Sequence, residues 1–476
     1  MKNRFVALFT VAALTLSLCA CGGNTPSGAS ASPADPGQTL SEQTENTDDA
    51  TAEDTTGTSE ENTDSEPSAD TAKEDTAADA TGSGDTTGED ASASSATDSD
   101  LPEGIVAVKL PPAVPIPDNE AMTFVRDMKV GWNLGNTFDA SNCNWLSDPL
   151  DYESAWCGTK TTKELILELK NAGFNSIRVP VSWHNHIDAD HNIDKAWLDR
   201  VQEVVDYVYE EGMYVILNIH HDDDPVYMYP SYDCTDSSKK YLTDIWTQLA
   251  ERFADYDTHL IFETMNEPRQ VGTDIEWWVP DVNADNAKEA FDCINQMNQA
   301  AVDAIRSVSK GYNTERYIMV PGYCASPEFA LIDAFQMPED SLATAENRLI
   351  LSVHAYTPYN FALNLSGTSE FDISKTSSTQ DIDSFMRRLY TKYVSKGLPV
   401  VIGEFGALDK DKNTESRVQY AAYYIAMARH FGLTAHWWDN NALNADGECF
   451  QIIDRKTLTW SFPEIRDQLI YYSVER

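Results

Sequence analysis

The feature that most constrains the fold is an eightfold alternation of short apolar runs with amphipathic stretches. The apolar runs are predicted strands because they are short, rich in β-branched residues and bounded by polar groups. They end near Asn136, Val181, His221, Glu267, Tyr323, Tyr356, Gly406 and Asn440. Helix-like stretches between them include residues 162–172, 195–211, 285–309 and 416–431. Eight strand–helix units in succession predict an α/β fold, the (β/α)8 or TIM barrel.

A doubly wound open sheet is the competing architecture for alternating strands and helices. Such a sheet does not require every strand to end in aromatic or hydrogen-bonding groups, as all eight regions do here. In a barrel, the carboxyl ends of the strands meet at one mouth, where barrel enzymes place their chemistry. The polar strand ends therefore favour the barrel.

Two glutamates, Glu267 and Glu404, stand at the polar ends of apolar runs 137 residues apart, or three strand–helix units. A carboxylate on a buried strand is costly unless it is paired or functional. Two carboxylates at the ends of strands 4 and 7 could face each other across the mouth, about 5 Å apart. That arrangement predicts the acid/base (Glu267) and the nucleophile (Glu404) of a retaining glycosidase.

The neighbouring residues suit this chemistry. Arg178 lies in a buried run and needs an anionic partner, and Tyr356 could donate a hydrogen bond to the same carboxylate, Glu404. We expect Glu267 to titrate above its ordinary range, because it is shielded and lies near Glu404. The amide of Asn266 could bind a sugar 2-hydroxyl, a contact that strengthens in the transition state.

His220 and His221 admit two interpretations, a sugar contact or a metal site. Adjacent residues on a strand face opposite ways, so we expect only one of the two to line the mouth. This geometry favours the sugar contact over the metal. The acidic run that follows, residues 222–224, is expected to be a solvated loop.

Aromatic residues cluster at the predicted strand ends and in the loops that follow. Sugar rings can pack their C–H faces on indole rings, so we expect an aromatic-lined cleft. By strand alternation, one of Trp437 and Trp438 should face the cleft and the other the barrel exterior. The other candidates are Trp132, Trp145, Trp183, Trp277, Trp278 and Tyr359.

The N-terminus predicts export. Lys2 and Arg4 precede an apolar stretch, residues 5–18, which is too short for a permanent membrane span. Residues 18–21, Leu-Cys-Ala-Cys, resemble a bacterial lipobox, which would make Cys21 the lipidated N-terminus of the mature protein. We therefore assign residues 1–20 to a lipoprotein signal peptide, with an ordinary cleaved signal as the alternative.

An acidic segment follows the signal. Residues 24–104 carry 21 acidic residues and one basic residue, Lys73, with no aromatic residue or cysteine. Such a composition cannot form a core and predicts disorder. We assign residues 21–117 to a disordered tether ending in a proline-rich collar, and residues 118–476 to one catalytic domain. The net charge of −43 argues against nucleic-acid binding.

The domain contains six cysteines. An exported protein can form disulfides, but six cysteines allow 15 pairings. Cys143 and Cys157 are close in sequence, and their pairing is the one disulfide that we expect. No CxxC spacing or histidine cluster suggests a structural metal. The six are Cys143, Cys157, Cys234, Cys293, Cys324 and Cys449.

Seven motifs taken in order carry a family resemblance. They begin at these residues: Gly131 (GWNLGNT), Ile177 (IRVP), Asn218 (NIHH), Met265 (MNEPR), His354 (HAY), Gly403 (GEFG) and Trp437 (WWDN). Together they resemble glycoside hydrolase family 5, and within it the subfamily 4 endoglucanases, over roughly residues 118–476. Asp222 stands where the family often has a glutamate after the paired histidines.

The resemblance implies a retaining enzyme with the catalytic pair named above. It implies that the following residues contact the substrate or the catalytic pair: Asn266, Arg178, His220, His354, Tyr356 and, as the better match to the family's platform tryptophan, Trp438. Our further candidates for substrate contact are His221, Trp437, Asn133, Trp132, Trp183 and Tyr359. It also implies substrates ranging over cellulose, mixed-linkage glucan, xyloglucan and sometimes xylan. No metal and no cofactor are expected.

The predicted function is a monomeric endo-β-1,4-glucanase that acts on β-glucan polysaccharides outside the cell, tethered to the bacterial membrane through a lipid anchor at Cys21. A β-mannanase or xylanase of the same barrel type is the first alternative. A non-catalytic glycan-binding lipoprotein is the second, and a structural surface protein is the third. Two glutamates with an arginine and a tyrosine beside them favour the enzyme.

Overall fold

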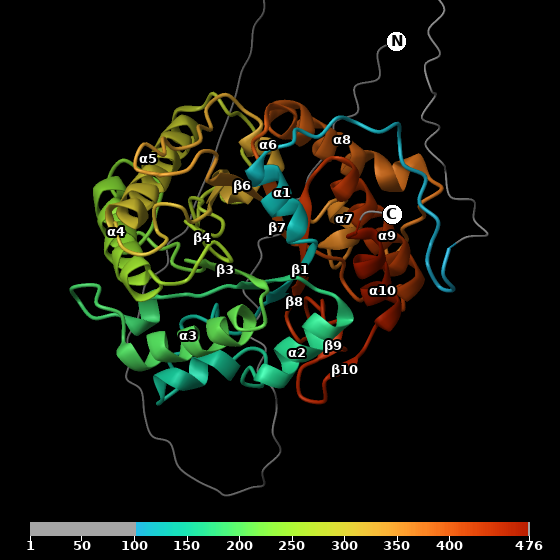
Figure 1. The fold of residues 1–476 in the computed structure, drawn as a ribbon, viewed down its shortest axis with the longest axis horizontal. Helices are drawn as coiled ribbons and strands as arrows, with labels where there is room; N and C mark the ends of the chain where they lie inside the picture. The colour runs from blue at the N-terminus through green and yellow to red at the C-terminus, as the bar shows by residue number, and fades with distance from the viewer. Residues whose placement is uncertain (1–100, 475–476) are drawn as a thin grey trace, which may run out of the picture. The chain divides into compact units, whose positions relative to one another are not determined.

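The computed structural model describes residues 101–474, and Figure 1 shows their fold. Eight parallel strands close into a barrel in the order β1 to β8, with each strand beside its neighbour in the chain. The predicted (β/α)8 barrel is confirmed. The predicted signal peptide, Cys21 and the acidic segment up to residue 100 lie outside the described residues.

The strands agree with the apolar runs of the sequence. All residues of the eight barrel strands are buried, which explains their continuous apolar character. Their bounds are β1 (Val130–Leu134), β2 (Ser176–Val179), β3 (Tyr214–Asn218), β4 (Leu260–Glu263), β5 (Ile318–Pro321), β6 (Leu349–His354), β7 (Val400–Phe405) and β8 (Thr434–Asp439). A short hairpin, β9 (Ile453–Asp454) and β10 (Thr459–Trp460), follows β8.

Helices surround the barrel in Figure 1. Several begin and end at residues typical of helix boundaries: Thr162 caps α2 through its side chain, and Gly173 ends it with a φ of 111°. Their bounds are α1 (Glu120–Asp127), α2 (Lys163–Ala172), α3 (Lys195–Tyr209), α4 (Thr235–Arg252), α5 (Asp285–Ser307), α6 (Pro327–Ala330), α7 (Tyr359–Ala362), α8 (Thr376–Lys392), α9 (Thr414–His430) and α10 (Pro463–Tyr472).

The barrel has an apolar end and a polar end. At the end where the strands begin, Val125 and Met128 pack with strand residues such as Ile216, Ile261 and others in a separate buried cluster. Helix α1 thus closes this end of the barrel. The other end, where the strands finish, carries the buried polar side chains described below.

The folded part of the chain begins earlier than the predicted boundary at residue 118. Residues 101–117 run in an irregular conformation along the domain, and they form the blue segment beside α8 and α10 in Figure 1. Gln468 bonds both Gly104 and Val106, and Tyr390 donates to the carbonyl oxygen of Pro115 at 2.8 Å. The assignment of this stretch to a disordered tether was therefore wrong, because partners some 270 to 360 residues away hold its backbone.

The expected disulfide between Cys143 and Cys157 is not formed. Cys143 and Cys157 are both buried thiols. The thiol of Cys143 donates to the carbonyl oxygen of Ser141, and that of Cys157 contacts the carbonyl oxygens of Glu153 and Thr159. Closeness in sequence did not bring these two side chains into bonding geometry.

Within residues 101–474, no helix has the length and apolarity needed to cross a membrane.

Candidate functional site

The arginine of β2 is the centre of the polar mouth. Arg178 is fully buried, and its guanidinium donates to Glu404 at 2.7 Å, to Glu263 at 2.8 Å and to Asn266 at 2.7 Å. It also donates to the side-chain oxygen of Asn133 at 3.0 Å. Burial alone would lower the pKa of Arg178, but the two carboxylates outweigh it and raise the pKa. Arg178 therefore carries a fixed positive charge at the mouth.

Glu404 receives a hydrogen bond on each carboxylate oxygen. Arg178 contacts Oε1, and the hydroxyl of Tyr356 donates to Oε2 at 2.9 Å. Burial, followed by the charge of Glu404, raises the pKa of Tyr356 well above its ordinary value, so this hydroxyl stays a donor. The two contacts together fix the orientation of the Glu404 carboxylate.

The backbone around Glu404 is irregular. The pairing of β7 with both neighbouring strands shifts register here, between Val353 and His354 on β6 and between Ile402 and Phe405 on β7. Such irregularities re-aim side chains at the rims of barrels. The residue before Glu404 is Gly403, which leaves room for the ring of His354. A Cβ at this position would lie 3.0 Å from Nε2 of His354, closer than an ordinary van der Waals contact. The turn of the strand thus directs Glu404 toward the mouth.

Glu267 lies beyond the end of β4 and pairs with a histidine. Its Oε1 is 2.8 Å from Nδ1 of His354, which lies on β6. Burial alone would raise the pKa of Glu267, yet the hydrogen bond and charge of His354, with Arg269 and His221, lower it. Our expectation that Glu267 titrates high in the free protein was therefore wrong, because it ignored the histidine.

His354 shows the opposite shift. Burial alone would lower its pKa, but the charge of Glu404 and the contact with Glu267 raise it. The Nδ1 atom of His354 also lies 3.6 Å from Glu404. The opposite directions of the two shifts reflect one contact, between Oε1 of Glu267 and Nδ1 of His354.

The two carboxylates face each other closely. One carboxylate oxygen of Glu267 and one of Glu404 lie within 4.8 Å of each other, and Nδ1 of His354 lies 2.8 Å from Glu267 and 3.6 Å from Glu404. The side chains remain partly accessible, with 18% of Glu267 and 7% of Glu404 exposed. Carboxyl groups about 5–5.5 Å apart are typical of retaining glycosidases, and inverting enzymes need about 6.5–9.5 Å. The spacing fits retention.

Sequence reasoning missed a third carboxylate, Glu263. It is fully buried at the end of β4 and accepts hydrogen bonds from Arg178, from Asn218 at 3.0 Å and from Ser352 at 2.6 Å. Its position inside an apolar run was the available signal, because a buried charge needs a partner. Glu263 contacts the Nε and Nη2 atoms of Arg178, and Glu404 contacts its Nη1 atom.

The two asparagines of the predicted site occupy different positions. The carbonyl oxygen of Asn266 accepts from Arg178, which leaves its amide NH2 group as the donor for a sugar hydroxyl. Asn133 is fully buried and donates to the carbonyl oxygen of Gly403 at 2.9 Å. Asn133 therefore supports the strand that carries Glu404.

Both histidines after β3 lie on the same side, contrary to the expected alternation. Strand β3 ends at Asn218, and the rings of His220 and His221 lie 4.4 Å apart, edge to face. Alternation does not apply because the chain has left the strand. Burial, then the charges of His221 and Arg178, lower the pKa of His220 well below its ordinary value, so its ring is neutral.

The paired tryptophans of β8 divide as alternation predicts. Register places Trp438 beside Asn133, inside the mouth, where its ring is parallel to that of His220 with centroids 6.0 Å apart. Trp437 pairs with Trp132, and both are fully buried toward the helices. Trp438 is therefore the platform candidate, and Trp437 is not.

Trp132 and Trp183 also lie in the core rather than in a cleft. Both are fully buried, and Trp183 donates its indole N–H to the carbonyl oxygen of Asn218 at 2.9 Å. Their inclusion among the substrate contacts was wrong, since no ring surface is open to a sugar. The exposed aromatic candidates are Trp145, Trp277, Trp278 and Tyr359.

The acidic run after His221 is not a solvated loop throughout. Asp222 is fully buried and accepts from the backbone N–H groups of Trp183 and His184 and from the hydroxyl of Tyr241. Asp223 pairs with Arg269 at 2.7 Å. Asp222 therefore anchors the loop after β2 to the loop after β3.

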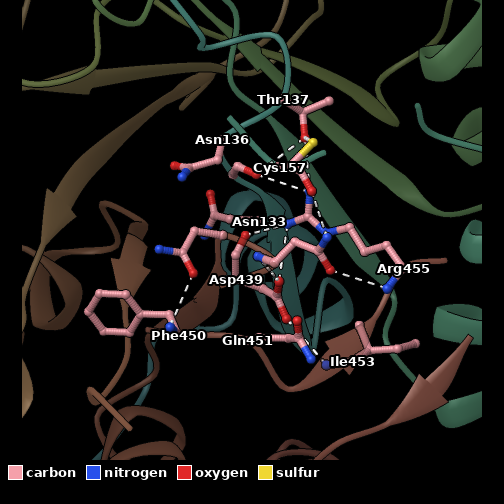
Figure 2. A network of polar contacts seen from close by, with 12 residues as sticks. Asn133, Asn136, Thr137, Cys157, Asp439, Phe450, Gln451, Ile453 and Arg455 are labelled. Atoms are coloured by element: carbon pink, nitrogen blue, oxygen red, sulfur yellow. Dashed lines mark hydrogen bonds and ion pairs between the residues drawn. The ribbon is translucent and has the colours of Figure 1, made fainter. Parts of the chain in front are cut away.

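A second buried arginine lies beside the mouth, in the network of Figure 2. Arg455 donates to Asp439 at 3.1 Å and to the carbonyl oxygen of Gly135 and the hydroxyl of Thr137. The other oxygen of Asp439 accepts from the backbone N–H of Ile452 at 2.8 Å. This network joins the end of β8 to the end of β1 and to the loop of residues 440–453.

Two sets of described residues have the composition of metal ligands. Asp139, His220 and His221 place three ligand atoms within 4.8 Å of one another, as do Glu267, His354 and Glu404. The oxygens of Asp139 already accept from the backbone N–H groups of Asn136 and Thr137. The side-chain amide of Asn218 forms a hydrogen bond with Nδ1 of His220 at 3.1 Å. Protein hydrogen bonds thus account for the orientation of Asp139 and of the His220 ring.

Known proteins share this fold. Residues 135–444 match the family model of cellulase (glycosyl hydrolase family 5). The chain belongs to glycosyl hydrolase family 5. A family 5 lichenase structure from a Caldicellulosiruptor species is similar with a TM-score of 0.76 and 53% identity, covering 78% of this chain and 99% of that one.

Two further relatives extend the comparison. A subfamily 4 broad-specificity endoglucanase structure from Ruminococcus champanellensis, with bound cellotriose, has a TM-score of 0.68 and 42% identity, covering 75% of this chain and all of that one (100%). The cellulase/esterase CelE of Acetivibrio thermocellus is 42% identical over 358 residues, which are 74% of this chain but 40% of CelE. The resemblance inferred from the seven motifs is confirmed.

Proposed function

We propose that this protein is an endo-β-1,4-glucanase that hydrolyses internal bonds of β-glucans with retention of configuration. The observation that carries the proposal is the pair Glu267 and Glu404, with carboxylate oxygens within 4.8 Å and different partners. Glu404 accepts hydrogen bonds from Arg178 and Tyr356, and Glu267 shares a hydrogen bond with His354. Double displacement needs one ionised carboxylate and one proton donor.

In the first step, a carboxylate oxygen of Glu404 attacks the anomeric carbon. The glycosidic C–O bond breaks, and the leaving oxygen takes the proton held by the Glu267–His354 pair. As Glu404 forms its bond it loses its negative charge, which had favoured the protonated histidine. The proton therefore moves from His354 toward Glu267 as the leaving oxygen needs it.

In the second step, Glu267 takes a proton from water, whose oxygen attacks the anomeric carbon. The ester bond to Glu404 breaks, and the free carboxylate returns to Arg178 and Tyr356. The sugar leaves with its original configuration because two inversions have occurred. The amide of Asn266 donates to the 2-hydroxyl of the reacting sugar in both steps.

The substrate class is a neutral β-glucan, of cellulose type, mixed linkage or xyloglucan. The names lichenase and broad-specificity endoglucanase of the similar structures support this range. Trp438 at the mouth and the exposed Trp277, Trp278 and Tyr359 offer ring surfaces for a sugar chain.

The experiment is a product profile with barley β-glucan, xyloglucan and carboxymethylcellulose, run beside mannan and xylan. We expect rapid release of oligosaccharides of mixed length from at least one glucan, as internal cleavage requires. The Glu404→Gln variant serves as the matched control for contaminating activity. Turnover of mannan or xylan alone would replace the glucanase assignment, and the absence of any product would favour a binding protein.

We also propose that residues 21–100 tether the domain to the bacterial surface through a lipidated Cys21. The lipobox-like residues 18–21 and the acidic, core-free composition of the segment support it. A flexible coil of about 80 residues has a reach of about 50 Å. Metabolic labelling with a fatty-acid analogue tests this, and a Cys21→Ser variant that still carries the label would contradict it.

A further inference from the structure

The loop after β8 is closed by its own first residue. The amide of Asn440 donates to the carbonyl oxygen of Glu448 at 2.9 Å, and its side-chain oxygen accepts from the backbone N–H groups of Ala442 and Phe450. One side chain thus ties both ends of the loop together. The position of Glu448 is therefore set by hydrogen bonds to the end of β8.

The arginine network of Figure 2 fixes the base of this loop. Asp439 accepts from the backbone N–H groups of Asn441 at 2.9 Å and Ile452 at 2.8 Å, one on each side of the loop. The guanidinium of Arg455 donates to the Asp439 carboxylate at 3.1 Å. A buried ion pair therefore fixes both ends of the loop.

The loop packs against the catalytic residues. Phe450 is fully buried in a small cluster with Leu408 and Trp438, and its ring lies 5.6 Å from that of Tyr356. Tyr356 is the donor to Glu404. Glu448 lies two residues before Phe450 and so belongs to the rim of the same mouth.

The side chain of Glu448 is exposed, yet the catalytic carboxylates act on it. Partial loss of solvation, followed by the charges of Glu267 and Glu404, raises the pKa of Glu448 to about 7. The charge of Glu448 in turn contributes to the raised pKa of Tyr356. Within residues 101–474, its carboxylate has no hydrogen bond or ion pair with the protein. Like charges nearby disfavour the ionised form of a carboxylate, and hydrogen-bond donors favour it.

We propose that Glu448 is a substrate-contacting residue, whose carboxylate accepts hydrogen bonds from hydroxyl groups of the glucosyl unit adjoining the scissile bond. The inference rests on the proposed function. Sugar hydroxyls are neutral donors, so they can satisfy this carboxylate without adding a charge beside Glu267 and Glu404. Hydrogen bonds to an ionised acceptor are stronger than those between neutral groups.

The test compares Glu448→Ala and Glu448→Gln with the control Glu251→Gln, which removes an exposed carboxylate from the last turn of α4. We expect Glu448→Ala to lower kcat/KM for barley β-glucan by about 10- to 100-fold, the effect of losing hydrogen bonds to a charged group. Glu448→Gln keeps an acceptor oxygen and should retain part of the activity. The unfolding temperature should remain at the wild-type value in all three variants.

A pH series separates this contact from a structural role. Glu448 is ionised above about pH 7 and protonated below it, so the deficit of Glu448→Ala should grow as pH rises through this range. A structural role would give a loss that is independent of pH and a lower unfolding temperature. Activity equal to that of Glu251→Gln at every pH would overturn the proposal, as would a loss that is independent of pH.

The Glu404→Gln variant in the same assay separates the two proposals. If Glu404→Gln is inactive and Glu448→Ala is fully active, only the role of Glu448 falls. If Glu404→Gln turns over at the wild-type rate, the proposed mechanism itself falls.

Discussion

Two buried arginines hold carboxylates at the same end of the barrel, and their surroundings differ. Arg455 holds Asp439, which is fully buried and whose oxygens also accept from the backbone N–H groups of Asn441 and Ile452. Arg178 holds Glu404, whose other partner is the side chain of Tyr356 and which stays 7% exposed. The oxygens of Asp439 are occupied by hydrogen bonds from the backbone and from a buried arginine, whereas the carboxylate of Glu404 remains partly accessible to a substrate.

Arg178 also binds a fully buried carboxylate that resembles Asp439 in its surroundings. Glu263 is fully buried and saturated by Arg178, Asn218 and Ser352. One guanidinium therefore bridges a structural carboxylate and a reactive one. The comparison teaches that partner identity and remaining access, rather than burial alone, separate the two roles.

The largest expected effect is that of Glu404→Gln. The amide keeps the shape of the side chain but cannot attack the anomeric carbon, so kcat should fall by at least about 10⁴-fold. Binding of a glucan oligosaccharide, measured by calorimetry, should persist because Trp438 and Asn266 are unchanged. A variant with the wild-type rate would remove Glu404 from the nucleophile role.

The next effect is that of Glu267→Ala, which removes the proton donor. Natural glucans have poor leaving groups, so their kcat/KM should fall by about 10²- to 10⁴-fold. Aryl glucosides with acidic phenols need little protonation and should lose much less. Steady-state kinetics over a series of phenols measures this difference. Equal losses for good and poor leaving groups would contradict the assignment.

A matched pair of variants tests the comparison of the two arginines. Glu263→Gln and Asp439→Asn each remove one buried charge while keeping the shape, and each should cost about 1–3 kcal/mol of the free energy of unfolding. Only Glu263→Gln should also lower kcat/KM of the folded enzyme, because it disturbs the hold of Arg178 on Glu404. Denaturant unfolding and kinetics at low temperature measure the two quantities. Equal losses of activity would erase the distinction.

The smallest expected effect concerns pH. The carboxylates of Glu404 and Glu267 raise the pKa of His354 above its ordinary value of about 6.5. The proton of the pair is therefore present below that raised pKa and lost above it, so the decline of kcat/KM toward alkaline pH should begin only above about pH 6.5. A pH profile of the free enzyme checks this. An alkaline decline that begins well below that value would contradict the shared proton.

The sequence alone predicts the barrel and the catalytic pair because both depend on where apolar runs end. It misses Glu263 because the predicted strand runs on to Glu267, whereas β4 ends at Glu263. The rule applied to Arg178, that a buried charge needs a partner, applies equally to Glu263. It misjudges Trp132 because the direction of a side chain depends on register. Once Asn133 faces Arg178, Trp132 must face the helices.

Other errors come from contacts between segments that are distant in sequence. Composition cannot reveal that Gln468 and Tyr390 hold residues 104–115 against the domain. Nor can it show that His354 meets Glu267 and reverses the direction of its pKa shift. Such pairings are set by the closure of the barrel, which places β4 and β6 side chains at one mouth.

The most direct test of the central claim is the configuration of the first product. Hydrolysis of cellopentaose can be followed by proton NMR in the seconds to minutes before mutarotation mixes the anomers. Because oxygens of Glu267 and Glu404 lie within 4.8 Å, the account predicts that the β-anomer forms first. Initial release of the α-anomer would contradict it.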